Sequence, residues 1–492
     1  MRIPLDRQSP IPLYQQIKDY FKEAILSGSL PPETRLPATR WLARDLGANR
    51  LAVDRAYNEL EMEGLVHSRV GSGTYVQMPF PQPSLPPGDA EATWPLWQQD
   101  DGEGIDAVHR LYPTEMLKSS RRANPVNLAG GIGDSCQFPL EEFRRIMQAV
   151  LRRDGISALE YGDREGYAPL RSTIAQVLAS EGIRAAAESI LITSGSQQGL
   201  TLTAQLLAKS GDTVLVEEPT YIGAISLFRN LRMKMVGIPV DEQGMQTEKL
   251  EKLLQQHHPR LIYTIPNFHN PTGACLPLQR RHQLITLAER YNVPILEDDY
   301  VGDLRYEGRA QPALKALDPG GRVIYASTFS KMLMPGLRVG FLAADGPIFG
   351  RLARLKYDTD LATSGLIQRA VESFVTIGRY QAHLRRTCQV YRKRRDAMLK
   401  AVRLYLPPEV NTSQPQGGLF VWVRLPEGMS SDELLPLACE EGVAFHPGSG
   451  FFLHGADGTR YLRLNFAAQP PERIEEGVRR LGRAIERLGG GA

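Results

Sequence analysis

Apolar residues near the start of the chain recur every three or four positions, which is typical of one face of a helix. The series follows Pro12, and Gly28 stands where a helix would stop. Its members are Leu13, Ile17, Tyr20, Phe21, Ala24 and Ile25. The segment TRWLARDLG predicts a short second helix that Gly47 closes, and Asn49 can cap a third. The pattern therefore predicts three consecutive helices.

The segment after these helices alternates between apolar and polar residues. LVHSRV and GTYV flank Gly71, Ser72 and Gly73, which is typical of two strands joined by a tight turn. A short helix, a glycine turn and a capped helix form a helix-turn-helix pattern, and a hairpin that follows it forms a wing. We therefore expect residues 1–77 to form a winged helix-turn-helix domain.

The third predicted helix carries the candidate DNA contacts. Arg50 and Arg55 would lie on its outer surface, where a recognition helix meets base edges and phosphates. Arg40 and the wing residue Arg69 would lie nearby. Ten Lys and Arg stand against nine Asp and Glu over residues 1–77, so charge alone does not separate DNA contact from a solvated surface. The order of the elements favours DNA contact.

A chain of 492 residues is too long for one ordinary domain. The segment MPFPQPSLPPGD, residues 78–89, holds five prolines, and no strong helix or strand period appears before Asn127. Proline-rich segments are semi-rigid spacers. We therefore expect a linker over residues 78–126 and a large domain over residues 127–492.

Strand-like apolar runs alternate with helical patterns throughout the large domain. The runs read SILITS, DTVLVEEP, RLIYTIP, VPILEDD and RVIYAS. Such alternation predicts an α/β fold, with a mostly parallel sheet covered by helices on both faces. Ligands of these folds bind beyond the carboxyl ends of the strands, and polar clusters follow several of the runs.

Three of these clusters suggest chemistry. SGSQQGL, residues 194–200, joins a strand to a helix and could cradle a phosphate at the helix N-terminus. The acidic end of VPILEDDY could either cap a turn or keep a pyridine nitrogen protonated. In SKMLMPGLRVGF, Lys331 has hydroxyls and Arg338 close by, which suits a lysine that forms an imine beside a phosphate. Arg463 could clamp a carboxylate or form a structural ion pair.

The first domain resembles a known family. The run RLPATRWLARDLGANRLAVDRAYNELEMEGLVHSRVGSGTYV is similar to the winged helix-turn-helix of the GntR superfamily of bacterial regulators. Where that family usually has Ser-Arg followed by Thr-Val, this chain has Asn49-Arg50 and Ala52-Val53. The resemblance implies that Arg50 touches DNA and that one threonine contact to a phosphate is lost.

The large domain resembles the pyridoxal-phosphate aminotransferases of fold type I over residues 127–486. The resemblance rests on PNFHNPTG, EDDY, STFSK and GLRVGF. It implies pyridoxal 5′-phosphate as cofactor, a smaller C-terminal subdomain, a Schiff base at Lys331 and a bond from Asp298 to the pyridine nitrogen. Asn270 and Tyr300 would then hydrogen-bond the phenolic oxygen of the ring.

The same resemblance assigns the other side chains of the site. The phosphate would be held by Gly195, Ser196, Thr328, Ser330 and Arg338. Tyr221 would stack on the ring, and Arg463 would take the carboxylate of a ligand. Tyr161, in EYGDREGY, matches a tyrosine that reaches the phosphate from the partner subunit, which implies a homodimer.

The fusion of these two parts resembles the MocR group of bacterial regulators. That resemblance implies a regulator that binds promoter DNA and senses pyridoxal phosphate, an amino acid or an amine through Lys331. A working aminotransferase with a vestigial or autoregulatory head is the alternative, because every group needed for imine chemistry is present and the sequence does not exclude turnover. A scaffold that has lost its cofactor is disfavoured because the groups needed for imine chemistry are all present.

Composition adds little to this picture. The formal net charge is +3, from 58 Lys and Arg against 55 Asp and Glu, so DNA contact requires a local patch. The four cysteines are scattered without a C-x-x-C pair, which argues against a zinc site or a disulfide framework. No signal peptide and no long apolar run are present, so we expect a cytoplasmic protein without a membrane segment.

One basic run remains. RRTCQVYRKRRD, residues 385–396, could add DNA contacts outside the winged domain, or it could be the solvated face of a long helix. We expect the second.

Overall fold

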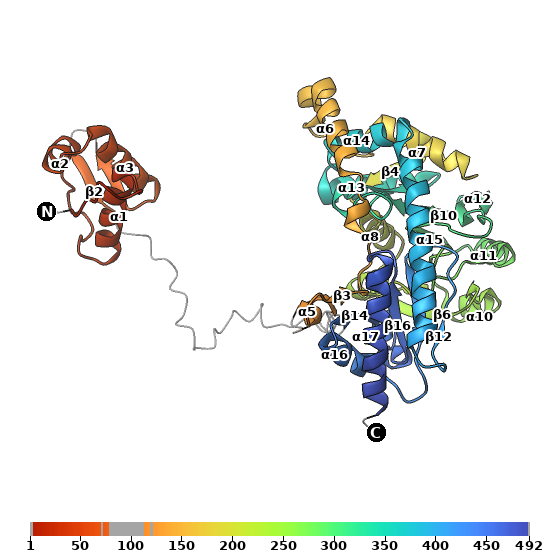
Figure 1. Cartoon of the computed structure of the whole chain (residues 1–492). Coiled ribbons are helices and arrows are strands. Elements are labelled where there is room, and N and C mark those ends of the chain that lie inside the picture. The colour runs from red at the N-terminus through yellow and green to blue at the C-terminus, as the bar shows by residue number, and fades with distance from the viewer. Residues whose placement is uncertain (1–2, 70–71, 78–112, 119–121, 491–492) are drawn as a thin grey trace. The chain divides into compact units, whose positions relative to one another are not determined.

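The computed structural model describes residues 3–69, 72–77, 113–118 and 122–490 (Figure 1). The chain divides into two compact units, residues 1–101 and residues 102–492. Residues 78–112, most of the expected linker, lie outside the described residues.

The first unit has the predicted order of elements. Its bounds are α1 Leu13–Leu26, α2 Thr39–Asp45, α3 Arg50–Met62, β1 Val66–Arg69 and β2 Gly73–Val76. The side chain of Asn49 caps α3 by accepting a hydrogen bond of 3.0 Å from the backbone N–H of Leu51. The rings of Phe21 in α1 and Tyr57 in α3 meet edge to face at 5.6 Å in the core. The winged helix-turn-helix is confirmed.

The extended segment before α2 pairs with strand β2 of the wing, which the sequence did not indicate. The backbone N–H of Leu36 donates to the carbonyl of Thr74, and that of Val76 donates to Thr34, both at 2.8 Å. These bonds lay the segment before α2 alongside β2. As a result the exposed Arg35 lies next to the wing.

The second unit is built on an eight-stranded sheet with the order β4-β11-β10-β9-β8-β5-β6-β7. The bounds are β4 Ile190–Thr193, β5 Thr213–Glu218, β6 Lys234–Asp241, β7 Gly244–Met245, β8 Leu261–Thr264, β9 Ile295–Asp299, β10 Val323–Thr328 and β11 Gly340–Ala343. Neighbours from β10 through β6 run parallel, whereas β11 is antiparallel to both β10 and β4. The mostly parallel sheet is confirmed.

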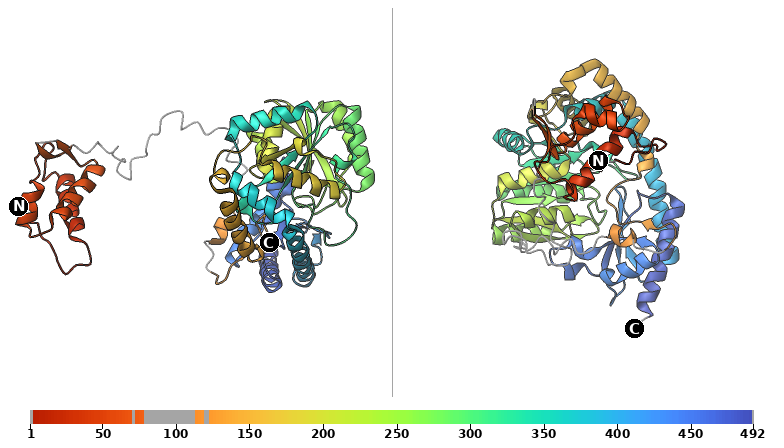
Figure 2. Two further views of the ribbon diagram at one scale, coloured as in Figure 1. Left: turned by 90° about the horizontal axis from the view of Figure 1, so that it is seen from above. Right: turned by 90° about the vertical axis from the view of Figure 1, so that its left-hand side faces the viewer.

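Alternate residues of the central strands enter separate cores on the two faces of the sheet. In β5, Val214 and Val216 belong to one core and Leu215 to the other. The first face is covered by helices that include α8 Ser196–Leu207, and the second by α10 Leu250–His257, α11 Leu278–Arg290 and α12 Leu314–Leu317 (Figure 2). Helices on both faces are therefore confirmed.

The described residues of this unit form further α-helices. They are α5 Pro113–Lys118, α6 Leu140–Asp154, α7 Ala168–Ser180, α9 Ile222–Asn230, α13 Pro347–Asp360, α14 Gly365–Thr376, α15 Arg379–Tyr405, α16 Ser431–Glu440 and α17 Pro471–Gly489. The long helices α15 and α17 pack side by side (Figure 1).

A smaller antiparallel sheet forms the C-terminal part, with the order β12-β13-β16-β15. Its bounds are β12 Asn411–Thr412, β13 Phe420–Arg424, β15 His446–Pro447 and β16 Tyr461–Asn465, and β3 Val126–Asn127 pairs in parallel with β14 Val443–Ala444. Leu117 of α5 and Val126 of β3 are buried in the core of this unit. The large unit thus takes in part of the segment assigned to the linker.

The basic run 385–396 is partly buried, which corrects the expectation of a solvated face. Arg394 is 4% exposed and pairs with Asp134 at 2.7 Å. Arg395 is 5% exposed and pairs with Glu307, also at 2.7 Å. These two arginines hold α15 against distant segments because a buried guanidinium requires partners. The exposed basic residues of the run are Arg385, Arg386, Arg392 and Lys393.

Candidate functional site

Lys331 lies in the loop that follows β10, and its side chain reaches the segment that contains Gly131. Its Nζ donates a hydrogen bond of 3.0 Å to the carbonyl of Gly131. Burial lowers the pKa of Lys331, and the positive charges of Arg463 and Arg338 lower it further, whereas the carboxylate of Asp298 raises it. A lowered pKa increases the fraction of neutral amine, which is the form that attacks a carbonyl carbon.

Asp298 is the penultimate residue of β9 and is 3% exposed. Its Oδ2 accepts a hydrogen bond of 2.9 Å from the hydroxyl of Tyr263 in β8. Burial raises the pKa of Asp298 to about 7, against the opposing effects of the Tyr263 hydroxyl and the charge of Lys331. Within the described parts of the chain, Oδ1 of Asp298 has no hydrogen-bond partner. A buried carboxylate oxygen of this kind suits a protonated ring nitrogen.

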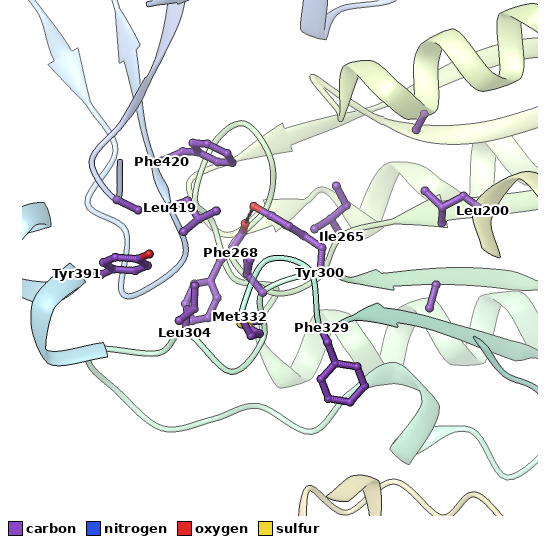
Figure 3. Packing of buried hydrophobic residues seen from close by; sticks show 14 of the residues in the cluster. Leu200, Ile265, Phe268, Tyr300, Leu304, Phe329, Met332, Tyr391, Leu419 and Phe420 are labelled. Atoms are coloured by element: carbon purple, nitrogen blue, oxygen red, sulfur yellow. Dashed lines mark hydrogen bonds between the residues drawn. The ribbon is translucent and has the colours of Figure 1, made fainter. Parts of the chain in front are cut away.

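Arg463, on β16, reaches the same region from the smaller sheet. One terminal nitrogen of its guanidinium donates to Oδ1 of Asn270 at 2.9 Å, and the plane lies 4.0 Å from the ring centre of Phe420. Burial lowers the pKa of Arg463 to about 10. The hydroxyl of Tyr300 donates to the carbonyl of Phe268 at 3.1 Å (Figure 3). The structure thus brings Asn270, Tyr300 and Arg463 together from segments far apart in sequence.

Four successive carbonyls, of residues 129–132, accept hydrogen bonds from side chains of this region. Arg463 donates to the first at 3.0 Å, and Lys331 donates to the third, also at 3.0 Å. The amide of Asn465 donates to the second and the fourth, at 2.7 and 2.8 Å. This segment comes shortly after β3, so the site residues hold it in place.

The turn before α8 and the loop before β11 approach each other closely. Gly195 has a φ of +84°, and a Cβ on it would lie 2.7 Å from a guanidinium nitrogen of Arg338. That guanidinium donates to the carbonyl of Ser194 at 3.0 Å. α8 begins at Ser196 with no acidic residue in its first turn. A guanidinium beside a free helix N-terminus can bind an anion such as a phosphate.

Two of the hydroxyls assigned to the phosphate, those of Thr328 and Ser330, differ in their surroundings. Oγ1 of Thr328 donates to the carbonyl of Val339 and accepts from the backbone N–H of Ser330, both at 3.0 Å. The hydroxyl of Thr328 therefore shapes the loop. Oγ of Ser330 is buried and has no hydrogen-bond partner among the described residues, so it is the better phosphate donor.

The two remaining tyrosines lie in opposite environments. Tyr221 precedes α9 and is partly buried, with its hydroxyl 3.3 Å from Oε1 of Gln197 in α8. Tyr161 is 85% exposed, so the described chain by itself does not bring it to Lys331. Tyr263, which the sequence did not mark, is the buried tyrosine that contacts Asp298.

The expected DNA contacts also differ from one another. Arg50 stands at the start of α3 with a half-exposed side chain, 3.3 Å from the carboxylate of Asp54. Arg55 lies over the ring of Tyr14, 3.8 Å from its centre, and donates to its hydroxyl at 3.1 Å, so it braces α3 against α1. Arg40 and Arg69, which also belong to the expected set, are exposed. Arg35, which the sequence did not mark, is exposed as well.

Comparisons with known proteins agree with this geometry. The pattern described as "Aminotransferase class I and II" matches residues 126–481, and the pattern described as "Bacterial regulatory proteins, gntR family" matches residues 13–76. A probable rhizopine catabolism regulatory protein, MocR, from Rhizobium meliloti is 31% identical over 487 residues, which is 98% of this chain and 95% of that protein. The chain belongs to the MocR-like transcriptional regulators.

Enzymes are also among the relatives of this regulator. A 2-aminoadipate transaminase from Thermus thermophilus is 39% identical over 397 residues, covering 80% of this chain and 98% of the enzyme. The solved structure of an α-aminoadipate aminotransferase from the same organism, complexed with N-(5′-phosphopyridoxyl)-L-leucine, is 37% identical with a TM-score of 0.74 and covers 80% of this chain and all of that chain. The family and this complex indicate pyridoxal 5′-phosphate as the cofactor, and the gntR module indicates DNA binding.

The residues present fit this cofactor. Oδ1 of Asp298 offers a buried acceptor for the ring nitrogen, and Ser330 and Arg338 offer donors for the phosphate.

Across the described residues, each helix is too short or too polar to span a bilayer.

The raised pKa of Asp298 predicts a pH-dependent contribution to stability in the cofactor-free protein. A carboxyl with a folded pKa of about 7 and an unfolded pKa of about 3.9 holds its proton only in the folded state between these values. The stability it contributes is therefore present at pH 4 and lost as the pH rises through 7.

Asp298→Asn removes this effect. The free energy of unfolding of the wild type should fall relative to that of Asp298→Asn between about pH 4 and 7, by at most about 1.4 kcal/mol per pH unit. Thermal unfolding at several pH values measures the difference. Glu427→Gln, at a side chain that is 95% exposed, controls for the substitution itself. An equal difference at pH 5 and pH 8 would contradict the assignment.

Proposed function

We propose that this regulator senses pyridoxal phosphate together with a carboxylate-bearing amine, and that occupancy of the site changes how the protein binds promoter DNA. The observation that carries the proposal is one buried region that holds a nucleophilic lysine, an unpaired carboxylate oxygen and a guanidinium. These groups belong to Lys331, Asp298 and Arg463. The lysine could hold the carbonyl carbon of the cofactor, the aspartate its ring nitrogen, and the arginine the carboxylate of an amino acid.

Each residue of the site has a role in this proposal. Bound pyridoxal phosphate supplies an electron-withdrawing ring and a carbonyl carbon that amines attack. Lys331 would hold the carbonyl carbon covalently, and Asp298 would accept the proton of the ring nitrogen. Asn270 and Tyr300 would orient the phenolic oxygen, and Tyr221 would cover one face of the ring. The phosphate would contact Gly195, Ser196, Ser330 and Arg338, with Thr328 shaping the loop.

Arg463 supports the assignment of a carboxylate to the effector. A fully buried guanidinium between aromatic rings is costly unless an anion or several acceptors satisfy it. It contacts two neutral acceptors, Oδ1 of Asn270 and the carbonyl of Ala129. An effector carboxylate would compete with these two acceptors for the guanidinium of Arg463. In the same way, the cofactor would compete with the carbonyl of Gly131 for the amine of Lys331. Ligand binding would then loosen the hold on residues 129–132, which follow the winged helix-turn-helix domain and the linker in the chain.

Lys331→Ala tests the sensing site directly. The variant is expected to lose the visible absorbance of lysine-bound cofactor while its winged domain still binds DNA. Footprinting of the purified full chain on the DNA upstream of its own gene, at fixed salt and with or without pyridoxal phosphate, should show a cofactor-dependent pattern only for the wild type. Lys252→Ala, at an exposed lysine of α10, is the control. A wild-type footprint that ignores cofactor and amino acids would refute sensing.

Arg50 is expected to contact the DNA backbone from the start of α3. Arg50→Ala should therefore reduce the slope of log affinity against log salt concentration by about 1. Arg55→Ala should change this slope little, because its guanidinium is engaged with Tyr14. A titration of labelled DNA at several salt concentrations measures both. An unchanged slope for Arg50→Ala would remove Arg50 from the interface.

An exposed apolar stretch supports a homodimer. Ile156, Leu159 and Tyr161 are 74%, 63% and 85% exposed. Large apolar side chains gathered on a surface mark an interaction site. We assign this stretch to contact with a second copy of the chain, in which Tyr161 would reach the cofactor phosphate of the partner.

Mixed dimers test the shared site. Lys331→Ala and Tyr161→Ala subunits should each form dimers with impaired cofactor binding. In a dimer that contains one subunit of each kind, one site combines the intact lysine of one chain with the intact tyrosine of the other. Half of the sites should then bind pyridoxal phosphate with wild-type affinity. Mixed dimers with no intact site would contradict the sharing of Tyr161.

Turnover is a second candidate function. It is favoured by the 39% identity to a transaminase and by the complete set of imine-forming groups. Incubation of the cofactor-loaded protein with amino acids and keto acids separates the two functions. Keto-acid product over many cycles would identify an enzyme, whereas a stable spectral change without product would identify a sensor.

A further inference from the structure

A buried tyrosine on the neighbouring strand donates a hydrogen bond to Asp298. Tyr263 lies on β8, which pairs in parallel with β9, and the residue opposite it is Leu296. Its hydroxyl reaches two residues further along β9 and donates to Oδ2 of Asp298 at 2.9 Å. Tyr263 is 0% exposed and Asp298 is 3% exposed, so water does not compete for this bond.

We propose that Tyr263 is a positioning residue for the cofactor: its hydroxyl orients the carboxylate of Asp298 and favours its charged form, so that Oδ1 is presented to the ring nitrogen. This inference rests on the proposed function of the site. The two oxygens of Asp298 then have separate tasks. Oδ2 is held by the protein, and Oδ1 is reserved for the ligand.

The contacts of Tyr263 fix its ring and leave its hydroxyl as a hydrogen-bond donor to Asp298. The edge-to-face contact with Phe228, at 5.8 Å between ring centres, fixes the ring. Burial and the adjacent Asp298 raise the pKa of Tyr263, so the hydroxyl stays protonated and can act as the donor. A second tyrosine–carboxylate pair lies one residue further along β9, where Tyr325 donates to Oδ2 of Asp299 at 2.9 Å.

Other groups also influence the charge of Asp298. Burial and the negative charges nearby disfavour its ionised form, and the bond from Tyr263 together with Lys331 favours it. The titratable groups that face it are Tyr263, Glu217, Asp299, Lys331, Tyr221 and Tyr300. Removing the Tyr263 hydroxyl therefore shifts ionisation of Asp298 to higher pH, because one stabiliser of the carboxylate is lost.

Tyr263→Phe in the full chain tests this role, with Tyr325→Phe as the matched control. Both substitutions delete one hydroxyl from a buried tyrosine–carboxylate pair, so both should lower the melting temperature. Only Tyr263→Phe is expected to weaken pyridoxal phosphate binding, by about tenfold. It should also move the pH midpoint of the cofactor absorbance upward by about one unit, whereas the control stays within error of the wild type.

Equal cofactor affinity and equal pH midpoints for the two variants would overturn the inference. If Tyr263→Phe fails to fold, site-specific 3-fluorotyrosine at position 263 keeps the ring and strengthens the donor, and the midpoint should move downward; no movement would again overturn it. A wild type that shows no cofactor absorbance, like Lys331→Ala, would instead refute the proposed function. A wild type that binds cofactor beside an unaffected Tyr263→Phe would refute only the role of Tyr263.

Discussion

The burial of three successive carboxyl groups at the end of β9 is the constraint on which the site depends. Glu297, Asp298 and Asp299 are 0%, 3% and 7% exposed, and a buried carboxylate is costly unless neighbouring donors satisfy it. Glu297 accepts two backbone hydrogen bonds from the start of α12, at 2.8 and 2.9 Å. Asp299 and Asp298 each take a tyrosine hydroxyl from an adjacent strand.

The parallel order of the sheet is what makes these donors available. Because β8 and β10 flank β9, each contributes a tyrosine to one of the two aspartates. Glu297 is fully engaged by the protein, whereas Asp298 and Asp299 each retain an oxygen without a hydrogen-bond partner among the described residues. Lys331 and Arg463 add positive charge to the same region, and burial lowers the pKa of both. The site therefore combines opposite charges whose desolvation a cofactor and a carboxylate could offset.

Local patterns predicted the elements, whereas the roles of the site residues came from the resemblance to the aminotransferases and stay predictions. The strand runs, the cap at Asn49 and the polar clusters at strand ends all follow from short-range periodicity. What sequence did not predict depends on contacts between distant segments. The antiparallel β11 lies between β4 and β10, and only a glycine at position 340 lets it approach the turn before α8. The bond from Tyr263 depends on strand register over 35 residues.

The basic run on α15 shows the same limit. Its charges resemble a solvated surface in isolation, yet Arg394 finds its carboxylate partner 260 residues away. Arg55 likewise has the position of a DNA contact, yet its guanidinium lies over the ring of Tyr14. Charge patterning identifies the side chains that can bind an anion. Only the packing identifies those whose charge the protein itself already uses.

A sensor and an enzyme need the same first interactions, which explains why a regulator would keep the complete set of imine-forming groups. Binding shifts a conformational equilibrium only by the difference in affinity between two states. In this chain the groups that would bind ligand, Lys331 and Arg463, also hold residues 129–132 through backbone carbonyls, and Asn465 holds the same segment independently. Ligand binding can therefore weaken part of this attachment while Asn465 keeps the rest. That arrangement supplies a difference in interaction energy without a completed reaction.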